Sequence, residues 1–435
     1  MAEADEKTKV GNYFISNYPP FSLWTPERRG AVEAVLAQQA PAEPPPLGLY
    51  IHLPFCRKRC DFCYFKVYTD KASGDIRRYV DRVLDEVAHY ARQPYLAGRQ
   101  LDFVYFGGGT PSYLSEKHLR ELFAGLRERI SWDGVREIAF ECEPGTLQQP
   151  KIQALYELGV TRLSIGVENF DPEILELNNR AHRAKEIYRV FDFARDAGFR
   201  SINLDLIAGM VAETDDNWAR CVEETAKLRP ESVTIYQMEV PYNTTIYRNM
   251  KDGGVEVAPV ADWATKRRWA GEAFARLESA GYRLGSAYTA CLDGIEFLYR
   301  DALWHGADML GVGVSSFSHL AGVHFQNEPS FEAYLNSVEA NGTAVSRALP
   351  LTDEERLVRE FVLQMKLGEL DAGYFRDKFG VDVLSRFGEA LERHVDAGLL
   401  TLEPDRIRAT REGLMRIDTL LPDFFAEEHR TARYA

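Results

Sequence analysis

The sequence has 435 residues, of which 45% are hydrophobic and 12% aromatic, and this suits a globular protein of two or three domains with large packed cores. Its formal net charge is −14 and it contains no long run of Lys or Arg, so it lacks the basic surface of a nucleic-acid-binding protein. It shows neither a secretory leader nor an apolar stretch long enough to cross a membrane. We expect a monomeric cytoplasmic protein with a small-molecule substrate and no nucleic-acid or membrane partner.

Four regions follow one another along the chain. Residues 1–47 form an N-terminal extension with an aromatic, Pro-containing segment and a Pro-rich run that is typical of a stiff linker. We assign a barrel to residues 48–290, an extension of its sheet to 291–349 and a C-terminal domain to 350–435.

Short apolar strands alternate with amphipathic helices through the barrel region. Six strand–helix units in series imply parallel strands joined by right-handed crossovers, and hence an α/β fold with a barrel or part of one. Two further strand-like pieces extend this sheet. The predicted strands of the six units lie at 47–53, 102–108, 136–142, 161–167, 201–209 and 232–240, and the further pieces at 281–290 and 307–320.

The C-terminal region has a different order: two helices, an apolar hairpin over 398–410 with its turn at Glu403, Pro404 and Asp405, and a last helix. This order describes a small winged-helix-like domain. Such domains often bind DNA, but the predicted helix over 382–398 is nearly balanced in charge. We therefore expect this domain to pack on the barrel or cover it.

Three cysteines, Cys56, Cys60 and Cys63, follow the first predicted strand with the spacing C-x3-C-x2-C. In a parallel barrel this loop lies at the catalytic face. Three thiolates can each bind one iron of a [4Fe-4S] cluster and leave the fourth iron open. A structural zinc site would need four closed ligands, and no second cysteine pair exists to supply them. The scattered cysteines fit buried packing positions instead: Cys142, Cys221 and Cys291.

The cysteine motif resembles the signature of the radical S-adenosylmethionine (SAM) superfamily. The resemblance implies that SAM binds the open iron and that its cleavage yields a 5'-deoxyadenosyl radical. The motifs YIHLPFC, FGGGTP, FECEPGT, LSIGVENF, NLDLIAG and GVGVS occur in order, and over residues 48–425 the chain resembles the HemN family of oxygen-independent coproporphyrinogen III dehydrogenases. We therefore expect a partial (β/α)6 radical SAM barrel with a C-terminal winged-helix-like HemN domain.

The same resemblance implies sites for two SAM molecules. Glycines of the GGGTP segment allow close approach of the backbone to a ligand. The residues matched to the cluster-bound SAM are Tyr50, Gly108, Glu141 and, as an addition, Phe317. Those matched to a second SAM are Phe62, Gly109, Thr110, Glu168, Arg180, Asp205 and Met238. Each also has a structural alternative: the carboxylates can accept hydrogen bonds from neighbours, Arg180 can pair with Asp205, and the apolar members can belong to the core.

The family includes porphyrinogen decarboxylases, heme chaperones, and methylases and cyclopropanases. The dehydrogenases carry a further cysteine two places after the third, where this chain has Phe65. The heme chaperones lack a substantial segment before the first motif, whereas here residues 13–25 resemble an aromatic tail that folds over the active site as a lid. These features favour methylation or cyclopropanation, with oxidative decarboxylation, heme transfer and heme degradation as alternatives.

In the favoured mechanism the deoxyadenosyl radical takes hydrogen from the methyl group of the second SAM, and the resulting methylene radical adds to an unsaturated carbon of the substrate. Glu168, Tyr236 and Glu239 are candidates for proton transfer because each lies near a predicted strand end. We expect a flavodoxin- or ferredoxin-type electron donor. A winged-helix DNA-binding protein with a redox-sensing cluster is an alternative from another class.

Overall fold

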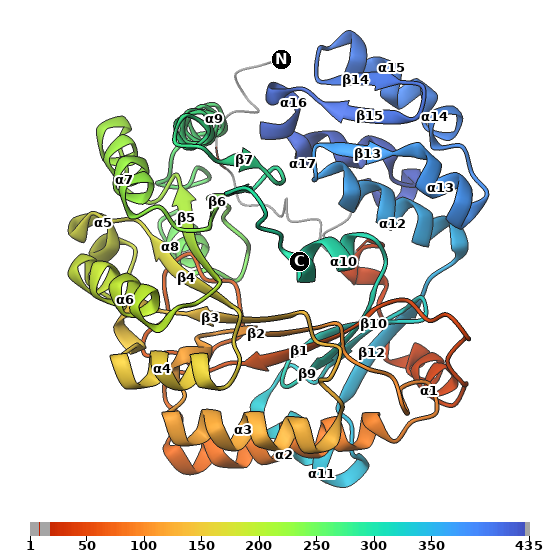
Figure 1. Ribbon diagram of the computed structural model, residues 1–435. Helices are drawn as coiled ribbons and strands as arrows, with labels where there is room; N and C mark the ends of the chain where they lie inside the picture. Colours follow the sequence, from red (N-terminus) through yellow and green to blue (C-terminus); the bar gives the residue numbers. More distant parts are fainter. Residues whose placement is uncertain (1–7, 9–17, 431–435) are drawn as a thin grey trace. The chain divides into compact units, whose positions relative to one another are not determined.

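The computed structural model describes residue 8 and residues 18–430 (Figure 1). It divides into two compact units, and each is described by itself. The cysteine unit comprises residues 24–205 and 297–350. The C-terminal unit comprises residues 206–296, 351–435 and those before residue 24.

The strands of the cysteine unit follow one another in the order β12-β11-β10-β9-β1-β2-β3-β4. Strand β1 pairs in parallel with β2 and β9, β2 with β3, and β3 with β4, whereas β9 to β12 pair antiparallel. Strand β5 (Ser201–Ala208) crosses from this unit into the other. The other bounds are β1 (Leu47–Leu53), β2 (Phe103–Gly108), β3 (Glu137–Cys142), β4 (Arg162–Glu168), β9 (Asp308–Val312), β10 (Phe317–Leu320), β11 (Val323–Asn327) and β12 (Val345–Pro350).

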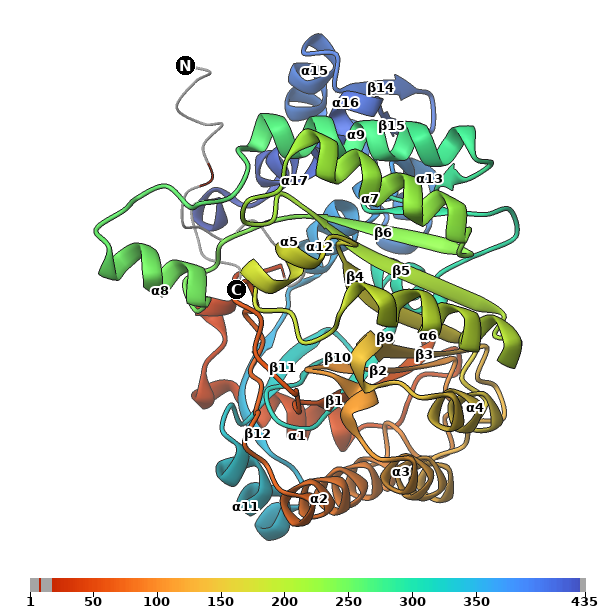
Figure 2. The same ribbon diagram turned by 90° about the vertical axis from the view of Figure 1, so that its left-hand side faces the viewer.

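Helices connect the parallel strands of this unit. Figures 1 and 2 show α2, α3 and α11 side by side along one face of the sheet. This strand–helix order confirms the predicted α/β class and its parallel core. The helices are α1 (Gly30–Leu36), α2 (Ser73–Ala91), α3 (Glu116–Arg129), α4 (Gln149–Glu157), α5 (Pro172–Leu177), α6 (Ala184–Ala197), α10 (Leu298–Trp304) and α11 (Phe331–Asn341).

Helix α2 illustrates why these segments become helical. Its buried residues Ile76, Val80, Val83 and Val87 recur at intervals of three and four, which places them on one apolar face. Asp75 accepts a hydrogen bond from the backbone N–H of Ala72 at 3.1 Å and so satisfies a donor at the N-terminus. The helix can therefore pack on the sheet directly after the cysteine loop.

Aromatic rings from three segments pack together inside the cysteine unit. Tyr105 of β2 stacks on Tyr299 at 4.2 Å between ring centroids and on Tyr50 of β1 at 5.9 Å. The carboxylate of Glu137 accepts hydrogen bonds from the backbone N–H groups of Leu298 (3.3 Å) and Tyr299 (3.0 Å). These contacts hold the start of α10 against the first residue of β3.

In the C-terminal unit, β8 (Thr289–Cys291) pairs antiparallel with β6 (Ser232–Gln237) and with β7 (Arg283–Leu284). The helices before the C-terminal domain are α7 (Asp215–Leu228), α8 (Thr245–Asp252) and α9 (Trp263–Ser279). Trp218 of α7 stacks on Trp269 of α9 with ring centroids 6.2 Å apart. The predicted strand piece at 281–290 is thus a short hairpin beside β6.

The C-terminal domain contains the predicted hairpin, formed by β14 (Leu400–Glu403) and β15 (Arg406–Ala409). A third strand, β13 (Glu369–Asp371), pairs with β15 and was not predicted. Three residues are too few to show a hydrophobic alternation. The helices are α12 (Asp353–Met365), α13 (Ala372–Phe379), α14 (Val383–Arg386), α15 (Gly388–Asp396), α16 (Arg411–Met415) and α17 (Ile417–Leu420).

The predicted lid segment over 13–25 is described only from Tyr18 onward, and its residues 13–17 lie outside the described part of the chain. Within the C-terminal unit, Tyr18 packs on Phe425 with ring centroids 5.0 Å apart. Within the cysteine unit, Trp24 stacks on His324 at 4.8 Å. Both aromatic side chains are buried, so each belongs to the core of its own unit.

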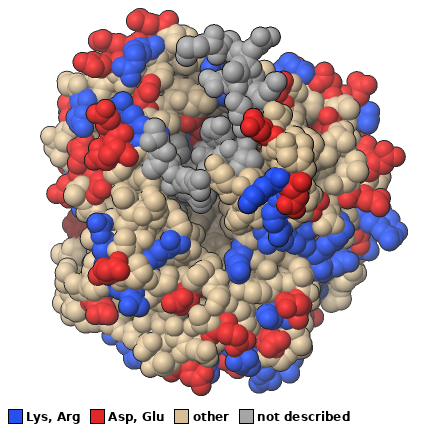
Figure 3. Space-filling model, turned by 180° about the vertical axis from the view of Figure 1, so that it is seen from behind, with Lys and Arg blue, Asp and Glu red and all other residues tan. Residues whose placement is uncertain are grey.

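On the face shown in Figure 3, Lys and Arg (blue) and Asp and Glu (red) are interspersed with other residues (tan). None of the helices in the described part of the chain is both long and apolar enough to cross a membrane.

Candidate active site

Cys56, Cys60 and Cys63 lie in the loop between β1 and α2. Backbone hydrogen bonds close this loop: the N–H of Cys56 donates to the carbonyl of Tyr68 at 3.1 Å, and the N–H of Tyr68 donates to the carbonyl of Pro54 at 2.7 Å. The N–H of Cys63 donates to the carbonyl of Cys60 at 3.1 Å. The three thiols are thus held together by the main chain.

The thiols need a positive partner to lose their protons. Burial raises the pKa of Cys56 to about 12 and that of Cys63 to about 11. The Thr110 hydroxyl donates to Sγ of Cys56, and Nη1 of Arg180 donates to Sγ of Cys60, each at 3.3 Å. Buried thiols that already receive polar donors suit anionic sulfur bound to a metal cluster.

A single metal ion fits this loop less well. Over residue 8 and residues 18–430, the structure contains no group of three His, Cys, Asp or Glu side chains that could hold one ion. In an iron–sulfur cubane each thiolate binds a different iron. The loop offers three thiols from one short segment to a cluster of that kind.

The backbone of the GGGTP segment, residues 107–111, packs closely against the cysteine loop. A Cβ atom on Gly109 would lie 2.9 Å from the carbonyl carbon of Pro54 and 3.0 Å from Sγ of Cys56. The N–H of Gly109 donates to the carbonyl of Leu53, and that of Thr110 to the carbonyl of Phe55, both at 2.9 Å. Gly108 has φ of 118°, which favours glycine. Only glycine allows this approach.

Glu141, near the end of β3, has both carboxylate oxygens engaged. The Tyr105 hydroxyl donates to Oε1 at 2.7 Å, and the N–H of Gly108 donates to Oε2 at 3.0 Å. Burial raises the pKa of Glu141 to about 7 in spite of these donors. The carboxyl group is therefore oriented next to the glycine segment.

Glu168 is the last residue of β4 and has φ of 62°, in the left-handed region that is strained for a residue with a side chain. Its Oε1 lies 3.4 Å from Nη2 of Arg180. Burial raises the pKa of Glu168 to about 7, although Arg180 opposes the shift. Burial alone would lower the pKa of Arg180, but Cys60 and Glu168 raise it overall. This pair joins β4 to the cysteine loop.

Asp205 of β5 carries a third carboxyl group, in addition to those of Glu141 and Glu168. Its carboxylate accepts hydrogen bonds from the Ser164 hydroxyl at 2.7 Å and from Nδ2 of Asn203 at 2.9 Å. Its charge contributes to the raised pKa of both Glu141 and Glu168, which places the three carboxyl groups near one another.

The sequence motifs behind this geometry belong to described families. Residues 50–225 match the radical SAM superfamily, and residues 351–416 match the HemN C-terminal domain. The chain thus carries a region that matches the radical SAM superfamily and a C-terminal region that matches that of HemN. The radical SAM superfamily implies a [4Fe-4S] cluster and SAM as cofactors. The residues of the cysteine loop and the glycine segment fit these groups, as their donors and close approaches indicate.

Similar proteins cover almost the whole chain. The solved structure of coproporphyrinogen III oxidase (HemN) from Escherichia coli superposes with a TM-score of 0.81 and 25% identity, over 94% of this chain and 96% of that one. The oxygen-independent coproporphyrinogen III oxidase of Salmonella typhimurium is 28% identical over 89% of this chain and 87% of its own length. The heme chaperone HemW of Bacillus subtilis is 25% identical over 87% and 99%. None of these names supports the predicted methylation or cyclopropanation, and the decarboxylation alternative fits them better.

The radical SAM site residues predicted from sequence fall into both units. The cysteines, Gly108–Thr110, Glu141, Glu168, Arg180 and Asp205 come together in the cysteine unit. Tyr50 and Phe317 lie there too, and the Tyr50 hydroxyl is 3.1 Å from Nδ1 of His52. Phe62 lies in the cysteine loop and is half-buried.

The predicted residues in β6 and directly after it belong to the C-terminal unit. Tyr236 is exposed, whereas Met238 is buried. The carbonyl of Met238 accepts a hydrogen bond from Nζ of Lys266 at 2.8 Å. Burial lowers the pKa of Lys266 to about 7, and the charge of Glu239 opposes this shift. Burial raises the pKa of Tyr288, and the charge of Glu239 adds to that shift.

Sequence reasoning missed two buried residues beside the cysteine loop, Glu143 and His182. Both lie within the motifs that located their neighbours, FECEP for Glu143 and NNRAH for His182. A polar side chain two positions after a matched residue, Glu141 or Arg180, was the signal in the sequence that could have identified them.

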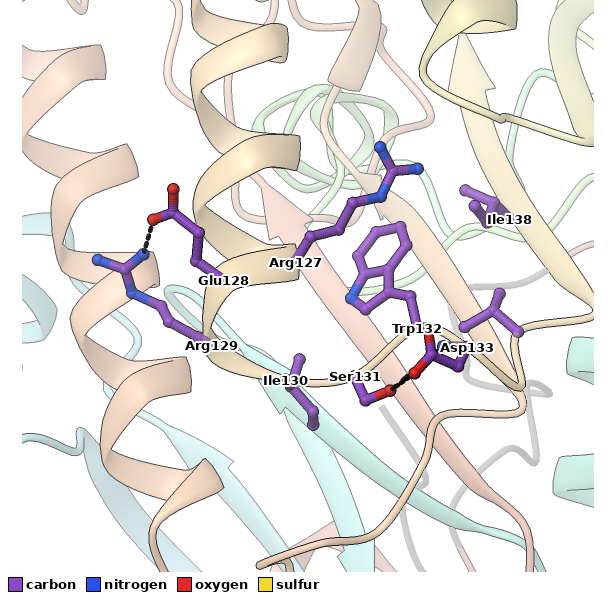
Figure 4. Close-up of a pocket in the computed structure, with 9 residues that line it drawn as sticks. Arg127, Glu128, Arg129, Ile130, Ser131, Trp132, Asp133 and Ile138 are labelled. Atoms are coloured by element: carbon purple, nitrogen blue, oxygen red, sulfur yellow. Dashed lines mark hydrogen bonds and ion pairs between the residues drawn. The ribbon is translucent and has the colours of Figure 1, made fainter.

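A surface hollow at the end of α3 lies away from all these residues. It is lined by residues from Arg127 to Ile138 (Figure 4). Inside it, the Ser131 hydroxyl donates to Asp133 at 3.0 Å, and Arg129 lies 3.7 Å from Glu128. The hollow contains none of the predicted site residues.

Proposed function

We propose that this radical SAM enzyme catalyses the oxidative decarboxylation of a propionate side chain on a porphyrinogen. The observation that carries the proposal is the similarity over nearly the full length, in both domains, to the coproporphyrinogen III oxidases of Escherichia coli and Salmonella typhimurium. Fold similarity alone would not suffice. Here the cysteine loop, the glycine segment and the buried carboxyl groups accompany it.

Cys56, Cys60 and Cys63 bind the cluster in this proposal. Tyr50, Gly108 and Glu141 contact the SAM on the open iron, with Phe317 as an addition. The oriented carboxyl group of Glu141 suits the amino end of a bound methionine.

A second SAM contacts the remaining matched residues. Glu168, Arg180 and Asp205 give this site both signs of charge, which suits a zwitterionic ligand. Its other contacts in the cysteine unit are Phe62, Gly109 and Thr110, and Met238 is matched to the same SAM by the sequence motif alone.

The bound cofactors supply a radical that takes a hydrogen atom from carbon. A propionate side chain becomes a vinyl group when it loses that hydrogen atom, carbon dioxide and one electron. The electron passes to an external one-electron acceptor. The residues of this chain hold the reactants and exclude water. The proton-transfer candidates remain Glu168, Tyr236 and Glu239.

Methylation or cyclopropanation is the second candidate function, and Phe65 favours it. The dehydrogenases that the chain resembles carry a cysteine at the corresponding position. Phe65 is exposed and its ring lies 4.5 Å from that of Tyr64. An apolar ring replaces a polarizable thiol beside the cluster loop, and this change would suit a different substrate.

Labelled SAM distinguishes the two functions. The enzyme is incubated anaerobically with coproporphyrinogen III, a reductant and SAM that carries a CD3 methyl group. Decarboxylation predicts unlabelled 5'-deoxyadenosine, carbon dioxide and a vinyl product. Deuterium in 5'-deoxyadenosine, with S-adenosylhomocysteine and a CD2-containing product from an unsaturated substrate, would reject decarboxylation in favour of carbon transfer.

A further inference from the structure

Two segments hold the cysteine loop in the cysteine unit. From one side, the turn over Glu143–Thr146 accepts a hydrogen bond from Nη1 of Arg57 to the carbonyl of Gly145 at 2.8 Å. A Cβ atom at position 145 would lie 2.4 Å from that Nη1 and 2.8 Å from Oε1 of Glu143, so the backbone of this turn closely approaches both side chains. Arg57 lies between the first two cysteines, so this turn fixes that part of the loop.

The second segment, residues 178–182, holds the other half of the loop. The carbonyl of Asn178 accepts from the N–H of Asp61 at 3.3 Å, and Nδ2 of Asn179 donates to the carbonyl of Arg59 at 2.9 Å. Arg180 then donates to Sγ of Cys60 at 3.3 Å. Backbone, amide and guanidinium groups of this segment therefore meet the loop from Arg59 to Asp61.

Glu143 and His182 connect the two segments. Nδ1 of His182 lies 3.5 Å from Oε1 of Glu143, and both side chains are buried. The N–H of Gly145 donates to the same oxygen at 2.9 Å. Burial opposes ionisation of Glu143, but His182 and Arg180 lower its pKa overall. The pair thus places an ionised carboxylate between the two segments.

The contact between Glu143 and His182 is long and leaves polar atoms without hydrogen-bond partners, so a substitution of either residue should disturb it. At 3.5 Å it is longer than an ordinary hydrogen bond. Oε2 of Glu143 and Nε2 of His182 are buried and have no hydrogen-bond partner among the described residues. A buried ionised carboxylate with few donors is costly, so removing the imidazole should displace the turn.

We propose that Glu143 and His182 are positioning residues for the cluster: the pair ties the turn at 143–146 to the segment at 178–182, and so fixes Arg57 and Cys60 relative to each other. The pair acts through these residues and contacts no cofactor itself. The inference rests on the proposed binding of the cluster by the three cysteines.

The test compares iron retention in the full chain after anaerobic reconstitution. We expect His182→Ala and Glu143→Gln to release iron to a chelator about 10-fold faster than the parent, as for other outer-sphere partners of metal ligands. The electron paramagnetic resonance spectrum of the reduced cluster should change as well. His182→Gln, whose amide can donate a hydrogen bond to Glu143, should restore much of the retention.

Glu137→Gln is the matched control. Glu137 is a buried carboxylate at the start of β3, the strand that Glu143 directly follows, and it also accepts hydrogen bonds from backbone N–H groups. It should keep the parent release rate and spectrum even where its melting temperature falls.

Equal iron release and spectra for His182→Ala and Glu137→Gln at matched loss of stability would overturn the inference. If His182→Ala does not fold, Glu143→Gln decides, and parent-like iron release and spectrum in that variant would also reject the inference. A parent chain that assembles no cluster, or a Cys60→Ala chain that assembles one normally, would instead reject the proposed cluster site.

Discussion

Nη1 of Arg180 donates a hydrogen bond to Sγ of Cys60 at 3.3 Å. A residue matched to the second SAM therefore also contacts a cluster ligand. Asp205, matched to the same SAM, instead accepts hydrogen bonds from Ser164 and Asn203. Substitutions of these two residues should for this reason have different effects.

We expect Arg180→Ala to reduce both 5'-deoxyadenosine formation and product, because it removes a charged donor from Cys60 and leaves Glu168 without its cation. Asp205→Asn should reduce product about 10-fold more than it reduces 5'-deoxyadenosine. Quantifying both compounds by chromatography checks this. Equal loss of both in Asp205→Asn, with the fold intact, would argue against a second SAM at this place.

Replacement of Cys56, Cys60 or Cys63 by Ala should abolish SAM cleavage and reduce the iron content. Cys142→Ala, Cys221→Ala and Cys291→Ala should retain about four iron atoms per chain, because these thiols are buried packing residues as predicted. Iron and sulfide analysis measures the difference. Normal SAM cleavage by Cys60→Ala would contradict the cluster assignment.

Gly109→Ala should disturb the cysteine loop. The added Cβ would meet the main chain of Pro54 and Sγ of Cys56 at 2.9 and 3.0 Å, and the main chain has no flexible end to move aside. We expect reduced iron content and weaker SAM binding by equilibrium dialysis. Gly74→Ala, in the first turn of α2 with no atom within 4 Å of the new Cβ, is the control and should bind both normally.

Glu86 should make stability depend on pH. Burial raises its pKa from 4.5 to about 7, although Gly313, Tyr334 and Asn327 donate hydrogen bonds to it. The folded chain thus holds this proton more tightly than the unfolded chain. The free energy of unfolding should therefore fall by up to about 3 kcal/mol as pH rises from about 4.5 to about 7.

Glu86→Gln cannot titrate, so its melting temperature should change less over this range than that of the parent. Thermal unfolding of both proteins from pH 5 to pH 8 measures the difference. Identical pH profiles would show that Glu86 keeps an ordinary pKa.

Lys366 and Asp418 form an ion pair within the C-terminal unit. Their Nζ and Oδ1 atoms are 3.4 Å apart, Lys366 is buried, and the Tyr288 hydroxyl donates to the other oxygen of Asp418 at 2.6 Å. Lys366→Met should lower the free energy of unfolding in urea by about 2 kcal/mol, because the carboxylate loses its cation. The double variant Lys366→Met/Asp418→Leu should recover part of the loss. Additive losses would mean that the two charges do not interact.

The parallel α/β core and the cysteine loop could be predicted from local sequence patterns. Strand–helix alternation is a local signal, and the spacing of Cys56, Cys60 and Cys63 is carried by eight consecutive residues. The short strand β13 and the antiparallel strands β11 and β12 escaped prediction. Their pairing depends on distant partners rather than on their own composition.

The partners of the site residues, by contrast, became known only from the folded chain. The sequence left Arg180 to pair with Asp205 or a ligand, whereas folding places it between Glu168 and Cys60, which are 12 and 120 positions away along the chain. The same holds for Glu143 and His182, which meet because the loops after β3 and α5 converge on the cysteine loop. Such contacts depend on how strands are ordered in the sheet, and no local pattern records that order.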